Sequence, residues 1–252
     1  MTGYDRQARP GDAFGAALLD YLHGGSGVHV TERDDGQSDT MGAGLYFAEY
    51  DEWENIHFAT GIDATALDIV SGRVLDVGAG AGRHSLVLQR RGDEPVALDT
   101  SPGAIEVCRE RGVEQIFLGT TDELAAQDPE PFDAAILLGH NLAILGSAEF
   151  SGPFLDSLRS LLKPGGVIVG NCRDPYTTDE PIHLAYHQRN RELGRMPGQI
   201  RLRVRFQDIA GGWFDYLFVS PAELAELAAA AGWRVEEATE PNPSYMAVLR
   251  PE

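Results

Sequence analysis

Residues 72–91 read Gly-Arg-Val-Leu-Asp-Val-Gly-Ala-Gly-Ala-Gly-Arg-His-Ser-Leu-Val-Leu-Gln-Arg-Arg. The apolar run over residues 74–77 predicts a strand, the alternate glycines Gly78, Gly80 and Gly82 predict a tight turn, and the amphipathic pattern beyond them predicts a helix. Glycine has no Cβ to hold a ligand away from the backbone, and the start of a helix offers unpaired N–H groups with partial positive charge. A small polar ligand is therefore expected at this turn.

The spacing of these glycines differs from that of dinucleotide-binding folds. Those folds use the pattern G-x-G-x-x-G, whose third glycine allows close packing of the helix. Arg83 occupies that position here. Asp76, two residues before the first glycine, adds an acid that could receive an ammonium group.

Residues 75–82, Leu-Asp-Val-Gly-Ala-Gly-Ala-Gly, resemble the first motif of class I S-adenosylmethionine-dependent methyltransferases. Later segments follow in the order of that family, so the resemblance covers roughly residue 71 to the C-terminus. It implies a Rossmann-like α/β fold with a mostly parallel sheet of seven strands, one of them antiparallel, and S-adenosyl-L-methionine as the cofactor. The expected domain spans residues 71–252.

The resemblance also implies which residues bind the cofactor. Asp99 ends the second predicted strand about twenty residues past Gly78, which is the separation that places a carboxylate on the ribose hydroxyls. Asp122 follows the third strand and resembles the acid that binds the adenine amine. As alternatives, Asp99 could cap a helix, although Ser101 suits that role better, and Thr121 or Asp122 could cap a short helix. The expected cofactor-binding residues are Asp76, Gly78, Ala79, Gly80, Gly82, Arg83, Asp99, Thr100, Thr121, Asp122, Leu138, Gly139 and Tyr46.

Histidines are the candidate catalytic bases. His140 follows the apolar strand predicted over residues 132–138, and ligands of open α/β sheets bind beyond the carboxyl ends of such strands. A neutral imidazole there could take a proton from an acceptor hydroxyl or amine, although a loop histidine is often structural. His57, His183 and His187 are further candidates. His183 and His187 lie four residues apart, but no third ligand is evident and no metal is expected.

Residues 1–70 are expected to form an N-terminal arm and a helical lid. Asp12 is a plausible N-cap for a first helix, and residues 28–32 alternate as in a short strand or extended segment. The aromatic stretch over residues 45–58 leads toward a second helix. Its members Tyr46 and Trp53 belong either to the core or to a cover over the cofactor and acceptor.

Residues 174–219 are expected to form a substrate-facing insertion before the last helix. Strict alternation over residues 199–206 puts Arg201, Arg203 and Arg205 on one face of a strand and apolar residues on the other. The aromatic strand at residues 213–219 then completes a β-hairpin. The arginines could attract an anionic substrate, or they could pair with local acids on a solvated face.

Composition narrows the substrate class. The chain has 252 residues, 20 basic and 39 acidic, with a formal net charge of −19. So acidic a surface repels phosphate backbones and anionic membranes, which favours a small molecule over nucleic acid or membrane partners. Cys108 and Cys172 read as reduced core residues, and the absence of a signal pattern or membrane span predicts a cytoplasmic protein, monomeric or homodimeric.

The expected reaction is methyl transfer from S-adenosylmethionine to an oxygen, nitrogen or carbon nucleophile of a small molecule, which could be anionic. One alternative is an NAD(P)-dependent oxidoreductase, which shares the strand, the glycine turn and the acid at Asp99. Arg83 and the Lys-Pro-Gly-Gly turn predicted at residues 163–166 argue against it. The other alternative is a module that binds the cofactor without turnover.

Overall fold

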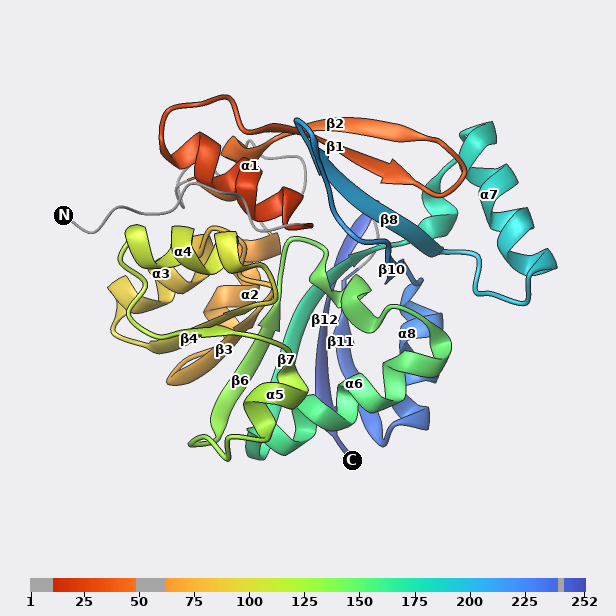
Figure 1. The fold of residues 1–252 in the computed structure, drawn as a ribbon. Helices are drawn as coiled ribbons and strands as arrows, with labels where there is room; N and C mark the ends of the chain where they lie inside the picture. The colour runs from red at the N-terminus through yellow and green to blue at the C-terminus, as the bar shows by residue number, and fades with distance from the viewer. Residues whose placement is uncertain (1–10, 49–61, 240–242) are drawn as a thin grey trace.

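Seven strands form the larger sheet of the computed structural model, which describes residues 11–48, 62–239 and 243–252 (Figure 1). They are β3 (Arg73–Val77), β4 (Glu94–Asp99), β5 (Ile116–Leu118), β6 (Phe132–Leu137), β7 (Leu162–Arg173), β11 (Trp233–Ala238) and β12 (Ser244–Pro251). Their order is β11-β12-β7-β6-β3-β4-β5, and the strands from β7 to β5 run parallel. β12 pairs antiparallel with both β7 and β11, which confirms the predicted Rossmann-like sheet.

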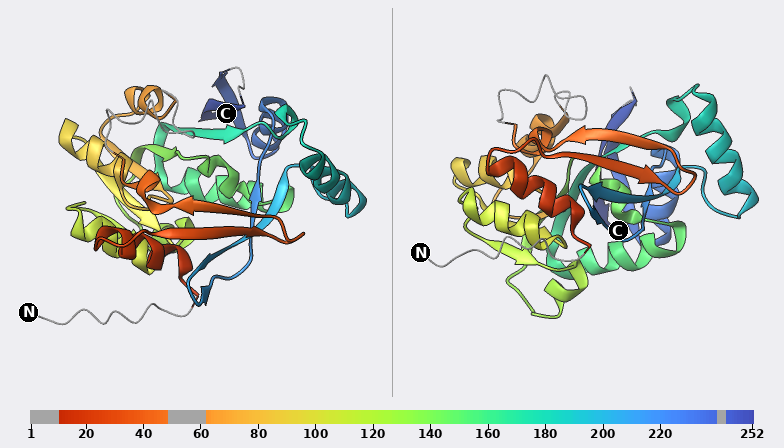
Figure 2. Two further views of the ribbon diagram at one scale, coloured as in Figure 1. Left: turned by 90° about the horizontal axis from the view of Figure 1, so that it is seen from above. Right: turned by 45° about the horizontal axis from the view of Figure 1, so that its top comes forward.

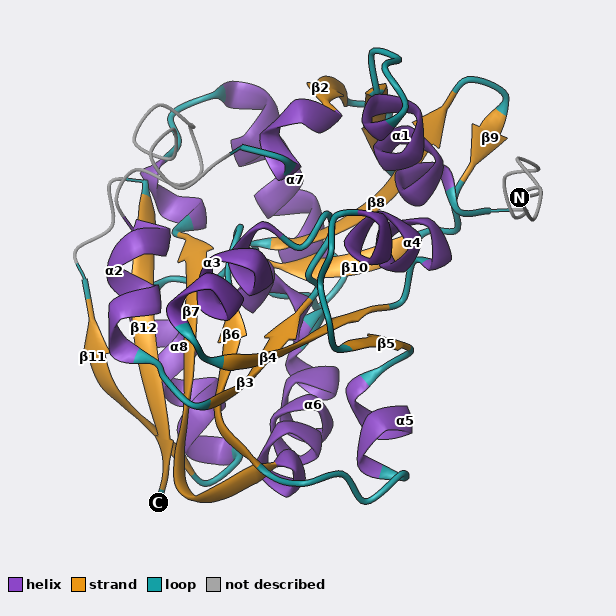
Figure 3. Cartoon of the chain, turned by 90° about the vertical axis from the view of Figure 1, so that its left-hand side faces the viewer, coloured by secondary structure: helices purple, strands orange, loops and turns teal. Residues whose placement is uncertain are grey.

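Helices cover both faces of this sheet (Figure 3). They include α2 (Ile62–Ile69), α3 (Arg83–Arg91), α4 (Pro102–Glu110), α5 (Thr121–Ala125), α6 (Ala148–Leu161) and α8 (Pro221–Ala230). α2 and α3 pack on the face that holds Ile136, whereas α6 and α8 pack on the face that holds Ala135. Because both faces are buried, a strand such as β6 needs apolar side chains at successive positions, and residues 134–138 have them.

The segment at residues 163–166 differs from the predicted turn. β7 already begins at Leu162, which pairs with Phe132, and the register then shifts so that Ala134 pairs with Val167. Gly165 has a φ of +81°, a left-handed conformation that suits glycine. The Lys-Pro-Gly-Gly segment is therefore an irregularity within the strand rather than a turn before it.

A second, antiparallel sheet lies over the carboxyl ends of the parallel strands (Figures 1 and 2). Its strands are β1 (Val28–Arg33), β2 (Ser38–Gly42), β8 (Gln199–Phe206), β9 (Ile209–Ala210) and β10 (Phe214–Leu217). The order is β10-β8-β1-β2, with β9 paired to β8. The predicted hairpin of the insertion is thus present as β8 and β10, but β8 also pairs with β1 from the N-terminal segment.

The N-terminal segment is only partly helical, in contrast to the lid expected from sequence. Its described residues contain α1 (Ala13–Leu22), the short 3-10 helix η1 (Ala43–Tyr46), the strands β1 and β2 between them, and α2 before residue 70. Asp12 caps α1 as predicted, because its side chain accepts from the Gly15 N–H at 3.0 Å. Trp53 and His57 lie outside the described residues.

The remaining described helices are the 3-10 helices η3 (Asn141–Leu145) and η4 (Pro175–Thr177) and the α-helix α7 (Pro181–Glu192). Cys108 and Cys172 are free and buried, as expected. Among the described residues, no helix combines the length and the apolar character that crossing a bilayer requires.

Candidate functional site

The three glycines after β3 all have left-handed backbone conformations, with φ of +73° at Gly78, +57° at Gly80 and +75° at Gly82. Their surroundings differ. A Cβ at Gly78 would lie 2.6 Å from Asn141 Nδ2, and one at Gly82 would lie 2.8 Å from a core valine, whereas one at Gly80 would meet only the Tyr46 ring at 3.6 Å and the Phe14 ring at 3.9 Å. Gly80 is therefore the glycine whose missing side chain leaves room for a ligand.

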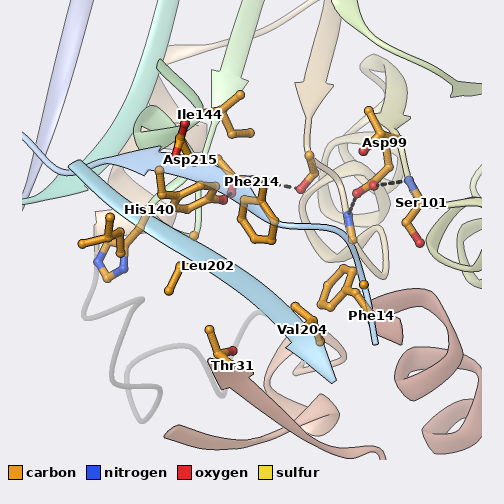
Figure 4. A pocket seen from close by; sticks show the side chains of 18 of the residues that line it. Phe14, Thr31, Asp99, Ser101, His140, Ile144, Leu202, Val204, Phe214 and Asp215 are labelled. Carbon is orange, nitrogen blue, oxygen red and sulfur yellow. Dashed lines mark hydrogen bonds between the residues drawn. The ribbon is translucent and has the colours of Figure 1, made fainter. Parts of the chain in front are cut away.

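Asp99 stands at the carboxyl end of β4 beside this turn. Its Oδ2 accepts a hydrogen bond from Gly80 N at 2.9 Å, and its Oδ1 accepts one from Ser101 N at 2.8 Å (Figure 4). Burial raises the pKa of the Asp99 carboxyl to about 6, although these two N–H donors oppose the rise. The helix cap is Ser101, whose Oγ accepts from Ala104 N, so capping leaves Asp99 available for another role.

Asp76 lies behind the turn rather than beside the ligand space. It is 1% exposed and accepts hydrogen bonds from Ser85 Oγ at 2.7 Å and from Ser85 N at 3.2 Å. These bonds tie β3 to the first turn of α3. Burial raises its pKa, and the charge of His84 and the bonds from Ser85 oppose that rise.

A large cavity of about 1290 Å³ separates the two sheets. Its floor consists of residues that follow β3, β4, β5 and β6, and its roof consists of residues of β1, β2, β8 and β10. Figure 4 shows Leu202 and Val204 of β8 near Thr31 of β1, with Ile144 on the other side of β8. The cavity thus combines the polar strand ends with a roof whose β8 part is apolar.

Thr121 and Asp122 also line this cavity, at the start of α5. The N-cap of α5 is Thr120, whose Oγ1 accepts from Glu123 N at 3.2 Å while the Glu123 carboxylate accepts from Thr120 N at 2.8 Å. Thr120 therefore caps α5, rather than Thr121 or Asp122, which were the alternatives considered from the sequence. Asp122 is left on the cavity wall.

Comparison with known proteins identifies the family. The family described as "Methyltransferase domain" matches residues 74–166. A solved structure of a SAM-dependent methyltransferase from Bacteroides fragilis, in complex with S-adenosyl-L-homocysteine, superposes with a TM-score of 0.77 at 26% identity, covering 96% of this chain and 97% of that one. These matches support a class I S-adenosylmethionine-dependent methyltransferase. S-adenosyl-L-methionine is accordingly its cofactor.

Curated relatives match a smaller part of this chain. A ubiquinone biosynthesis O-methyltransferase of Xylella fastidiosa is 35% identical over 99 residues, which are 37% of this chain and 39% of that protein. Another protein with this name, from Xanthomonas euvesicatoria, is 28% identical over 185 residues, which are 69% of this chain and 67% of that protein. The matched region thus spans about two fifths of the first of these relatives.

Most of the cofactor residues expected from sequence share the cavity wall. Asp76 and Gly82 do not line it, because the first lies beneath the turn and the second faces the core. The expected residues that do line it are Tyr46, Gly78, Ala79, Gly80, Arg83, Asp99, Thr100, Thr121, Asp122, Leu138 and Gly139. The paired oxygens of Asp99 and the open backbone at Gly80 suit a nucleoside with ribose hydroxyls, so the residues present fit the cofactor.

His140 lies on the cavity wall in a strained backbone conformation, with φ of +68°. Its ring Nε2 is 2.7 Å from Ser244 Oγ, and its backbone N–H donates to Asn171 Oδ1 at 2.7 Å. Burial lowers the pKa of His140 to about 4, while Asp63 opposes the shift and Arg173 adds to it. The imidazole is therefore neutral at physiological pH.

The other candidate histidines are distributed differently. His183 and His187 lie on α7 and line the cavity at the far end of the roof. His183 Nδ1 accepts a hydrogen bond from Arg33 Nη1 at 3.2 Å, because a guanidinium can only donate. His187 is buried, and this burial together with nearby cations lowers its pKa. His57 falls outside the described residues.

A buried acid that the sequence analysis did not identify connects the cofactor turn to His140. Asp63 of α2 is fully buried and accepts from Arg83 Nη2 at 2.6 Å, from His84 Nε2 at 3.0 Å and from Asn171 Nδ2 at 3.2 Å. Burial opposes its ionisation, but the bond from His84 and the charges of His84 and Arg83 hold its pKa below the ordinary value. No local sequence signal distinguishes Asp63 from a solvated acid on a helix.

The arginine row of β8 faces away from the cavity. Arg203 donates to both carboxylate oxygens of Glu32 at 3.0 Å, and Arg205 lies 3.6 Å from the same carboxylate. The opposite face of β8 places Ile200, Leu202 and Val204 on the cavity wall. Arg203 and Arg205 thus pair with a local acid, as in one of the two alternatives, whereas Arg201 makes no ion pair within the described residues. The apolar face of the strand lines the cavity.

Proposed function

We propose that this chain transfers the methyl group of S-adenosyl-L-methionine to a hydroxyl oxygen of a small molecule. The observation that carries the proposal is a single cavity that joins the glycine turn to an apolar roof. Its volume of about 1290 Å³ exceeds the roughly 300–1000 Å³ typical of a pocket for one ligand, so the cofactor and an acceptor have room together. The names of the curated relatives support oxygen over nitrogen or carbon.

In this proposal the floor of the cavity holds the cofactor. The carboxylate of Asp99 accepts from the ribose hydroxyls, Asp122 accepts from the adenine amine, and the backbone at Gly80 lies against the nucleoside. Tyr46 covers the turn from the roof side. When bound, the cofactor supplies a methyl group that its positive sulfur makes electrophilic, so the protein contributes chiefly alignment and exclusion of water.

His140 is the proposed partner of the acceptor oxygen. Its neutral ring can accept a proton, but a pKa of about 4 makes it a weak base at neutral pH. We therefore expect an acceptor hydroxyl that is itself acidic, such as a phenol or an enol, whose proton leaves readily as the oxygen–methyl bond forms. Ser244 holds the ring through its contact with Nε2.

Mass spectrometry of a small-molecule extract incubated with the protein and a methyl-deuterated donor tests the proposal. A product that carries the labelled methyl group on oxygen is expected, and it should be absent with an Asp99→Ala variant. Binding of S-adenosyl-L-homocysteine without any labelled product would favour a non-catalytic module. Thermal stabilisation by NAD rather than by S-adenosylmethionine would contradict the proposal altogether.

A further inference from the structure

We propose, on the basis of the function above, that the acceptor is an amphiphile with an apolar or aromatic body and an anionic end group such as a carboxylate. The body lies under β8 and β10, and the anion lies at the α7 end of the cavity against Arg173 and His183. This anion site differs from the arginine row of β8, which faces outward.

The roof provides the surface for the body. Register in the upper sheet pairs Thr31 with Val204 and Arg33 with Leu202, so that alternate residues of both strands face the cavity. The cavity-facing apolar residues of the roof and of the facing η3 helix are Met41, Ile144, Ile200, Leu202, Val204, Phe214 and Phe218. Hydrogen-bonding groups of an acceptor that lay against these apolar residues would be left unsatisfied, whereas Thr31, Arg33 and Asp39 offer polar partners on the β1 and β2 side of the roof.

Arg173 provides the charge for the end group. It is the last residue of β7 and is exposed, and it lines the cavity together with Pro175 and Thr178 of the segment that leads from β7 into α7. Among the residues that the structure describes, it makes no ion pair, unlike Arg33 and Arg83 on the same wall. An anion at this place would gain a charge-assisted partner without displacing an existing one.

The neighbouring wall is arranged to donate hydrogen bonds. Arg33 is 7% exposed and gives Nε and Nη2 to Asp35 at 2.8 and 2.7 Å, which balances its charge. Its Nη1 bonds His183 Nδ1, and its guanidinium lies 4.1 Å from the Tyr186 ring centroid. Because Nδ1 of His183 accepts, the ring proton is on Nε2, and His183 presents a donor rather than a base.

Local electrostatics distinguish this end from the rest of the molecule. The formal net charge of the chain is −19, which repels anions in general. Of the acids on the cavity wall, Asp39 and Asp215 are carried by β2 and β10 of the roof, and Asp12, Asp99 and Asp122 lie at the cofactor end. At the α7 end, burial lowers the pKa of His187, and the positive charges of Arg191 and Arg33 lower it further. An anionic group is therefore best accommodated beside α7.

A matched pair of probes tests the inference. Protein saturated with S-adenosyl-L-homocysteine is titrated with 4-phenylbutyrate and with 4-phenylbutanamide by ligand-observed NMR, since the two differ only in the charge of the end group. We expect the carboxylate to bind about tenfold more tightly than the amide in the native protein. Arg173→Gln should bring the ratio close to one, mainly by weakening the carboxylate.

Arg201→Gln is the control, because it removes the same charge from an exposed position on the outward face of β8. It should keep the native ratio. Equal binding of the two probes to the native protein, survival of the ratio in Arg173→Gln, or failure of both probes to bind would overturn the inference. Calorimetry with S-adenosyl-L-homocysteine on the same samples separates this result from failure of the proposed function, which would show as no binding of the nucleoside.

Discussion

Replacing Gly80 by alanine gives the most direct test of where the cofactor lies. Gly80 has a φ of +57°, and the added Cβ would lie 3.6 Å from Tyr46, an ordinary contact. The variant therefore suffers only the backbone cost of a left-handed alanine, about 1–2 kcal/mol. Gly92 ends α3 with a φ of +90°, and a Cβ added there would have no heavy atom within 4 Å, so Gly92→Ala has the same cost away from the cavity.

These free-energy costs correspond to measurable decreases in the melting temperature, Tm. In a chain of this size each kcal/mol lowers Tm by about 2–4 °C, so both variants should melt about 2–8 °C below the native protein. Gly82→Ala should lower Tm further, because its Cβ would lie 2.8 Å from Val113 Cγ2 and overpacking adds a cost of about 1–3 kcal/mol. Differential scanning calorimetry measures all three.

Cofactor binding should separate Gly80 from Gly92. The added methyl at Gly80 occupies the space beside the N–H that donates to Asp99, and affinity for S-adenosyl-L-homocysteine should fall about tenfold or more. Gly92→Ala should bind as the native protein does. Isothermal titration calorimetry at about 25 °C measures both affinities. If Gly80→Ala and Gly92→Ala bind the nucleoside equally well, the cofactor does not approach this backbone and the proposed site is wrong.

Three further predictions concern Asp99, Asp63 and a pair of glycines. The affinity of the native protein for S-adenosyl-L-homocysteine should weaken as pH falls below about 6, because the Asp99 carboxyl then gains a proton and becomes a poorer acceptor, whereas calorimetry on Asp99→Asn should show weaker binding without this dependence. Asp63→Asn should lower the free energy of unfolding in urea by about 3–5 kcal/mol, since it removes the buried carboxylate charge to which Arg83 and His84 are bonded. The folded pKa of Asp63 is depressed, so this difference should be present above its ordinary pKa of 3.8 and should shrink as pH falls below that value. Gly103→Ala should lower Tm, because its Cβ would lie 2.6 Å from Gly15 Cα, whereas Gly152→Ala in α6, with nothing within 4 Å, should raise stability by about 0.5–1 kcal/mol.

Local patterns in the sequence predict much of the part of the molecule that is built on the seven-stranded sheet. The strand, turn and helix at residues 72–91 follow from apolar periodicity and glycine spacing, and the caps at Asp12 and Ser101 follow from side chains that reach a donor three residues away. Alternation over residues 199–206 also predicts the two faces of β8. Each of these features depends on interactions between residues that are near one another in the chain.

The antiparallel sheet above the cavity depends on contacts between segments that are far apart in the sequence. Nothing near residue 28 indicates that β1 pairs with the distant strand β8, and only this pairing determines that the apolar face of β8 looks into the cavity while Arg203 meets Glu32. Asp63 likewise reads as a solvated acid until α2 packs against Arg83 and Asn171. The sequence by itself determined the glycine-rich turn and its flanking elements, because backbone conformation there is chosen locally. Only the tertiary structure decided which side chains line the roof of the cavity and which polar groups are buried, because pairing and burial depend on free energy summed over the whole chain.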